Sequence, residues 1–144
     1  MQEFPHHYRV SLDTRPDSPT VSITSQGLPT LVTAPPAEFG GPGTHWSPET
    51  LLVAAVADCF TLGFKMIAQA SRLEWSRLEV NVSGKLDRID KKMKFTELDI
   101  VANVTVPEAQ ASKAPRILEK AEENCLITNS LSANVRFTGN VTGS

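Results

Sequence analysis

The chain has 144 residues, of which 40% are hydrophobic and 21% are charged. This length and composition predict one globular domain over residues 1–144, large enough to bury a core without disulfide or metal staples. The formal net charge of −2 gives no electrostatic reason to expect a nucleic acid or an anionic membrane as a partner. The first ten residues lack the apolar core of a signal peptide, so we expect a cytoplasmic protein.

The first third of the chain is predicted to form short strands. Apolar and polar residues alternate over 8–13 and 20–24, and residues 28–33 can supply a third strand. Prolines and glycines mark the turns between these segments, and they dominate a loop over 35–43.

A long helix is predicted to follow, beginning at Ser47–Glu49 and ending near Ser71. Its first residues supply a capping hydroxyl, a proline suited to the first helical position and an acid at the positive end of the helix dipole. Apolar residues occupy nearly every face of the helix, which predicts burial on all sides. One chain of this size has little material to cover it, so we expect a second subunit to supply part of the cover. Asp58 and Lys65 within this segment argue against a membrane span.

The rest of the chain is predicted to form a sheet and a second helix. Clean alternation over 79–87 and 97–106, with a turn at 90–92, indicates a half-buried antiparallel sheet. The second helix is expected over about 112–124 and a last strand over 134–142. Strands, helix, strands, helix and strand, in this order, predict an α+β fold.

The two cysteines are the strongest candidates for chemistry. Cys59 falls within the long helix, and Cys125 falls where the second helix is expected to end. In a reducing compartment, such cysteines are more often catalytic, redox-active or simply buried than joined in a permanent disulfide, and the local sequence leaves these alternatives open. A metal site is disfavoured, because the cysteines and His6, His7 and His45 lack the spacing of zinc ligands.

Thiol chemistry proceeds through the thiolate, and a nearby cation lowers the pKa of a thiol. Arg9 and Arg15 precede the long helix, and Arg15 lies in a turn from which its side chain can swing. On local sequence alone, a solvated turn arginine is the simpler interpretation of Arg15. An acid that complements the helix dipole is the simpler interpretation of Glu49.

Residues 47–60 resemble the signature helix of the OsmC/Ohr family of thiol peroxidases. In that helix a Pro-Glu pair opens the first turn, and a cysteine followed by an aromatic residue comes ten positions after the Glu; here these residues are Glu49, Cys59 and Phe60. The order of strands and helices also agrees with the family over about residues 8–142. Two further segments resemble the family's loop before the helix and its second-cysteine region: 38–41 and 123–131.

The resemblance implies an OsmC-like fold in an intertwined homodimer, and a peroxidase that reduces organic hydroperoxides without a metal or a bound cofactor. It implies that Cys59 is the peroxidatic cysteine and that Cys125 resolves it by forming a disulfide. Glu49 matches the acid that holds a catalytic arginine, and Arg15 matches that arginine, with Arg9 as the second choice. The electrons would come from an external thiol, either a small dithiol or a lipoylated protein.

Two other functions remain open, a non-catalytic ligand-binding protein and a redox sensor. Many family members carry proline after the second cysteine, whereas this chain has Leu126. The sequence therefore leaves the subfamily, the preferred peroxide and the reductant open.

Helix geometry makes one further prediction about Glu49 and Cys59. Ten residues of continuous helix rise about 15 Å and turn through about 1000°, which leaves the two residues roughly 80° apart around the axis. No Pro or Gly lies between them to break the helix. We therefore expect Glu49 to serve the Cys59 of the other subunit.

Overall fold

A computed structural model describes all 144 residues of the chain. The chain falls into two compact units, residues 1–51 and residues 52–144, which are described in turn. The first unit contains a three-stranded antiparallel sheet and the short 3-10 helix η1 (Ala37–Phe39). All three predicted strands are present but shorter than expected, as β1 (Ser11–Asp13), β2 (Val21–Thr24) and β3 (Leu31–Thr33).

Helix α1 (Pro48–Ala70) begins where the sequence predicted, and it is unbroken. The Thr50 N–H donates to Ser47 Oγ at 3.1 Å, and the Ser47 N–H donates to Thr50 Oγ1 at 2.8 Å. This reciprocal pair satisfies backbone donors that the first turn of a helix leaves free. By length and composition α1 would also suit a membrane span, a test that core helices of soluble proteins pass as well.

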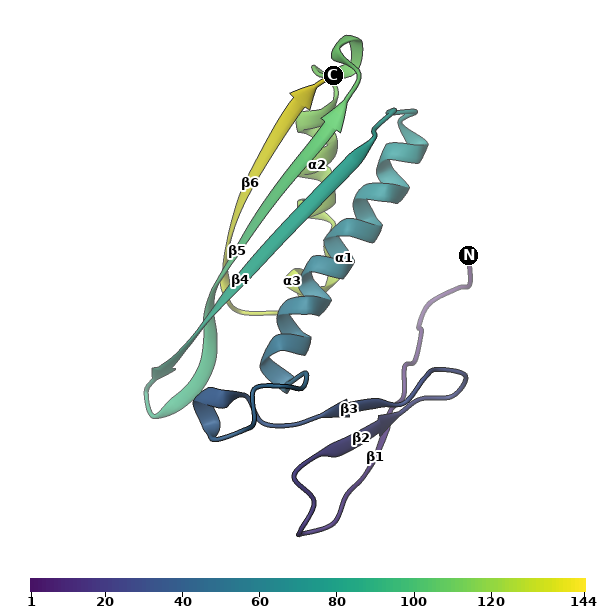
Figure 1. Ribbon diagram of the computed structural model, residues 1–144. Coiled ribbons are helices and arrows are strands. Elements are labelled where there is room, and N and C mark those ends of the chain that lie inside the picture. The colour runs from purple at the N-terminus through teal and green to yellow at the C-terminus, as the bar shows by residue number, and fades with distance from the viewer. The chain divides into compact units, whose positions relative to one another are not determined.

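The second unit holds a sheet with the strand order β4-β5-β6, formed by β4 (Arg77–Ile89), β5 (Lys92–Val106) and β6 (Asn134–Gly143). β4 and β5 form the antiparallel hairpin that the sequence predicted, and β6, whose direction the sequence left open, runs parallel to β5. The reason is the connection, because α2 (Ala114–Glu123) lies between β5 and β6 and carries the chain back to the end from which β5 started. Figure 1 shows this arrangement.

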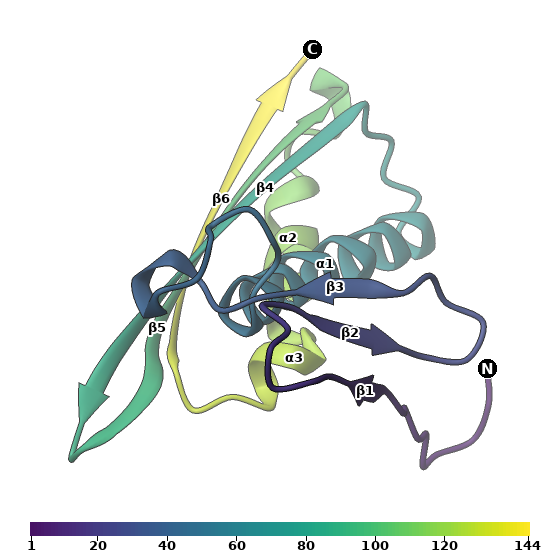
Figure 2. The same cartoon turned by 60° about the horizontal axis from the view of Figure 1, so that its bottom comes forward.

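The core of this unit lies between the helices and one face of the sheet. Figures 1 and 2 show α1 and α2 on the same side of the sheet. Gly84 allows α1 to approach closely, because a Cβ at this position would lie 2.9 Å from side-chain atoms of both Val53 and Phe95. The fully buried residues of α1 recur at every fourth position and pack against the inner face of β5: Val56, Phe60, Phe64 and Ala68 against Leu98, Ile100, Ala102, Val104 and Val106.

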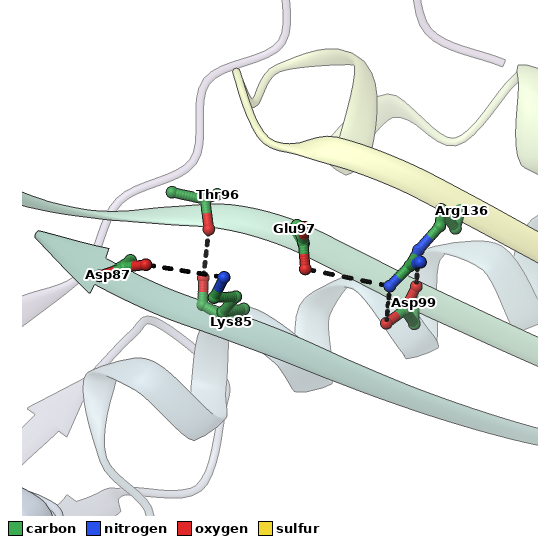
Figure 3. Close-up of polar contacts among 6 residues, drawn as sticks. All are labelled: Lys85, Asp87, Thr96, Glu97, Asp99 and Arg136. Carbon is green, nitrogen blue, oxygen red and sulfur yellow. Dashed lines mark hydrogen bonds and ion pairs between the residues drawn. The ribbon is translucent and has the colours of Figure 1, made fainter. Parts of the chain in front are cut away.

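The other face of the sheet is polar. Arg136 on β6 donates from Nε and Nη2 to the two carboxylate oxygens of Asp99 on β5, at 2.7 and 3.1 Å, and Glu97 lies 3.9 Å from the same guanidinium (Figure 3). On β4, Lys85 Nζ lies 3.6 Å from Asp87. The alternation read from the sequence therefore separates an apolar inner face from a charged outer face.

Within this chain α1 is not buried on all sides, as the sequence prediction expects of a helix that one chain cannot cover alone. Leu62 is 52% exposed and Met66 is 65% exposed. The physical reason is that the sheet and α2 cover only the side of α1 that faces them. An apolar strip along α1 is left facing outward.

Candidate functional site

The structure brings the two predicted cysteines together within the second unit. Cys59 lies on α1 beside the buried stripe and is partly exposed. Cys125 lies directly after α2 and is only 1% exposed. Both are free thiols, and Cys125 is near enough to Cys59 to raise the pKa of its thiol. Two neighbouring free thiols are the groups that thiol–disulfide exchange requires.

The backbone around Cys125 is held by a short turn of helix that the sequence did not predict. Helix α3 (Leu126–Asn129) starts directly after Cys125. The Thr128 hydroxyl and the Asn129 N–H both donate to the Cys125 carbonyl, at 3.1 and 3.0 Å. The Asn129 side-chain amide donates to the Glu123 carbonyl at 3.2 Å. These bonds fix the direction in which Cys125 and the following amides point.

Burial raises the pKa of the Cys59 thiol above its ordinary value, and the neighbouring Cys125 acts in the same direction. The backbone of Ile127 and of Leu126 lowers the pKa of Cys59, but these two groups do not offset the burial. Sequence reasoning missed both groups. A four-residue helix has no periodicity to reveal it, and a backbone N–H leaves no signature in side-chain chemistry.

The acid and the arginines predicted for the site lie in the first unit. Arg15 Nη1 donates to Asp13 Oδ1 at 2.7 Å and to the Thr14 carbonyl at 3.0 Å, so within this unit its partner is Asp13 rather than Glu49. Glu49 Oε2 is buried and accepts no hydrogen bond. Arg9, the second choice, lines an open hollow together with His7, Tyr8, Ser11, Thr24, Ser25 and Gln26.

Known proteins share the motifs and the fold of this chain. A family model described as OsmC-like protein matches residues 41–139. Peroxiredoxin OsmC of Escherichia coli is 27% identical over 96 residues, which are 67% of this chain and 66% of that protein, just under two thirds of its length.

Solved structures extend the likeness to nearly the whole chain. An OsmC-like protein of unknown function from Vibrio cholerae has a TM-score of 0.81 at 19% identity, covering 96% of this chain and 100% of that one. An organic hydroperoxide resistance protein from Elizabethkingia anophelis has a TM-score of 0.77 at 17% identity, covering 99% and 100%. The predicted α+β fold is therefore confirmed as the fold of these proteins.

Proposed function

Because the chain belongs to the OsmC-like protein family, we propose that it is a thiol-dependent peroxidase that reduces organic hydroperoxides to alcohols. The observation that carries the proposal is the meeting of two free thiols, one partly exposed at Cys59 and one buried at Cys125. A peroxide can reach the first, and the second lies close enough to resolve the product. The printed names of two relatives, a peroxiredoxin and an organic hydroperoxide resistance protein, support the same reaction class.

The proposed cycle has three balanced steps. The Cys59 thiolate attacks the distal oxygen of the hydroperoxide; the O–O bond breaks, the alkoxide takes a proton and leaves as an alcohol, and Cys59 becomes a sulfenic acid. The Cys125 thiol attacks this sulfur, water leaves, and an intrachain disulfide forms. An external dithiol or a lipoyl-bearing protein then reduces the disulfide by exchange and is itself oxidised. The cycle needs no metal or bound cofactor and suits a reducing, cytoplasmic compartment.

A cation is needed to make the thiolate available at neutral pH. Burial raises the pKa of Cys59, so the sulfur needs positive charge close to it. We propose that Arg15 supplies the charge and that Glu49 orients its guanidinium. The buried Glu49 Oε2 without a hydrogen-bond partner supports this role, because a buried carboxylate oxygen needs a donor.

We propose that the working enzyme is an intertwined homodimer of single OsmC-like domains spanning residues 1–144. The exposed apolar strip on α1, which includes Leu62 and Met66, gives a second subunit a surface to cover. The unbroken helix holds Glu49 about 15 Å along its own axis from Cys59, so the acid serves the Cys59 of the partner.

Single-cysteine variants test the function, with tert-butyl hydroperoxide as substrate and dithiothreitol as reductant. Cys59→Ser should lose all reaction with peroxide, because it removes the nucleophile. Freed of dithiothreitol before the assay, Cys125→Ser should consume about one equivalent of peroxide per chain and stop, leaving a sulfenic acid that dimedone traps and mass spectrometry detects.

The wild type provides the control for the resolving step. One equivalent of peroxide should remove both free thiols while the protein keeps the mass of a single chain on a non-reducing gel. Equal reaction of the two variants with peroxide would refute the assignment. Absence of turnover in the wild type would instead favour a ligand-binding protein of the same fold.

A further inference from the structure

We propose that Gly63 keeps the space beside Cys59 open, so that a reagent carrying an organic group can reach this thiol. The inference deepens the proposed peroxidase function and rests on it, because the organic group in question would be that of the hydroperoxide. It assigns to one position of α1 the limit on the size of the molecule that Cys59 can accept.

Gly63 is the one glycine that neither the backbone nor the packing within the chain requires. Of the eight glycines, three have a positive φ, which favours glycine: Gly27, Gly40 and Gly43. Four others have a neighbouring atom 3.1 Å or less from the position that a Cβ would take: Gly41, Gly84, Gly139 and Gly143. At Gly63 no heavy atom lies within 4 Å of that position, the backbone of its own helix and its chain neighbours aside.

Glycine is an unfavourable residue at this place in the chain. Gly63 lies in the interior of α1, where glycine loses more backbone freedom on folding than any other residue. Alanine would strengthen the helix, and its methyl group would meet no other atom. The reason for the missing side chain therefore lies outside the fold of α1, in the use of the space that it leaves.

That space lies next to the reactive thiol. Gly63 follows Cys59 by four residues, so the two positions are neighbours on the surface of α1, and both are partly exposed. Side chains on a helix tilt toward its N-terminus, so a side chain at position 63 would lie over the turn that carries Cys59. A long side chain there would crowd the sulfur, whereas glycine leaves the approach along the helix surface free.

The residues that border this space one turn further along α1 are apolar. Met66 follows Gly63 by three residues and is 65% exposed, and Ile67 follows it by four and packs against the core cluster. The charged residues nearest to Gly63 on the helix point elsewhere. At about 100° per residue, Asp58 and Lys65 lie roughly 140° and 160° around the axis from Gly63. The space therefore suits an uncharged organic group.

The proposed reaction needs such a space only when the peroxide is organic. The sulfur attacks the distal oxygen in line with the O–O bond, and the organic group is carried by the departing oxygen, beyond the bond that breaks. Hydrogen peroxide has no such group. The side chain at position 63 should therefore change the rate for an organic peroxide and leave that for hydrogen peroxide nearly the same.

Maleimides of two sizes test the access to Cys59 without peroxide. Reduced full-length protein is treated with N-methylmaleimide or N-phenylmaleimide, and the rate of Cys59 modification is measured by peptide mass spectrometry. Gly63→Leu should lower the ratio of the phenyl rate to the methyl rate about tenfold, because the added side chain crowds the larger reagent. Gln69→Leu adds the same side chain at an exposed position about 15 Å along the helix from Cys59 and should leave the ratio unchanged.

An unchanged ratio in a folded Gly63→Leu protein would overturn the inference. Gly63→Ala gives a second measurement, because its urea midpoint should rise if the position is open. A fall of that midpoint, or a Gly63→Leu protein that does not fold, would show that the position is closed and that the inference is wrong. A change of assembly mass in light scattering for Gly63→Leu but not for Gln69→Leu would also overturn it, because the glycine would then make room for a second chain.

Peroxide turnover distinguishes failure of this inference from failure of the proposed function. In an active peroxidase, Gly63→Leu should lower kcat/KM for cumene hydroperoxide about tenfold relative to kcat/KM for hydrogen peroxide. Absent turnover in the wild type would refute the peroxidase proposal. The maleimide ratio would still decide whether Gly63 controls access to Cys59.

Discussion

Helices α1 and α2 pack on the same face of one sheet, yet the sides that they turn away from the sheet differ in chemistry. The outward side of α2 carries an ion-pair cluster in which Arg116 lies 3.1 Å from Glu119 and 3.0 Å from Glu123. The outward side of α1 presents Leu62 and Met66 instead. The comparison teaches that the outward side of α2 is suited to water, whereas the outward side of α1 needs to be covered by a second chain.

The cysteines follow the same division. Cys59 lies on α1, the helix with the uncovered side, whereas Cys125 lies after α2 and is buried within its own chain. We therefore expect the activation of Cys59 to depend on a partner subunit. We expect the reaction of Cys125 with Cys59 to take place within one chain. The following predictions test this difference, from the largest expected effect to the smallest.

Mixing inactive variants should restore activity only for the residue at the start of α1. In a heterodimer of Glu49→Gln and Cys59→Ser chains, one composite site has both defects and the other has none, so peroxidase activity should recover to about half of wild type per heterodimer. The activity is measured after subunit exchange has been verified by native mass spectrometry.

The matched control mixes Cys125→Ser with Cys59→Ser chains. Because Cys125 resolves Cys59 within one chain, every site then lacks one of the two thiols and turnover should not recover. Inactivity of the Glu49→Gln mixture despite verified exchange would show that the acid acts on the cysteine of its own chain.

A charge on the outward side of α1 should break the dimer. Leu62→Glu buries a carboxylate without a partner in the proposed interface, and this cost opposes association. Light scattering should fall from about twice the chain mass of 15.7 kDa to about that mass. Lys120→Glu, on α2, is the control and should leave the mass unchanged; a wild type that is already a monomer at micromolar concentration would contradict the dimer itself.

Truncation of the inward side of α1 should destabilise the fold itself. Phe64 is fully buried, and its ring centroid lies 5.5 Å from that of Trp75 in an edge-to-face contact. Phe64→Ala should lower the free energy of unfolding by about 3–5 kcal/mol, measured by urea denaturation at fixed protein concentration. A loss below about 1 kcal/mol would mean that this stripe is not the core.

The ion-pair cluster on α2 should contribute least. Arg116→Ala removes both ion pairs, but the side chains are exposed, so water and salt screen the attraction. The urea midpoint should not move resolvably at physiological ionic strength. A clear drop in that midpoint would show that the ion pairs on the outward side of α2 also stabilise the fold. It would weaken the contrast with α1.

Much of the fold was predictable because its elements are encoded by local patterns. The period-two alternation placed β4, β5 and β6 to within a few residues, apart from the start of β5, which lies five residues before the predicted one. The cap at Ser47 marked the start of α1 through a hydroxyl whose hydrogen bond lies within one turn. The first sheet was predicted less well, because its strands pair over only three or four residues and little of their surface is buried.

The sequence identified the two thiols of the candidate site but not the backbone around them. The motif around Glu49 and Cys59 identified one thiol, and the end of the second helix identified Cys125. Their proximity and the turn of α3 came only from the structure. Both depend on how segments far apart in the sequence pack together, which residue types alone cannot show.

The sequence by itself determined the long helices and the strands, which side of each long strand is apolar, and where the thiols lie along the chain, but not the short helix α3. These properties depend on residues a few positions apart. Only the tertiary structure decided that β6 runs parallel to β5, that α1 buries a single stripe, and that Cys59 meets Cys125. Those outcomes depend on which distant surfaces pack together, and a hydrophobic face specifies that it must be covered without specifying what covers it.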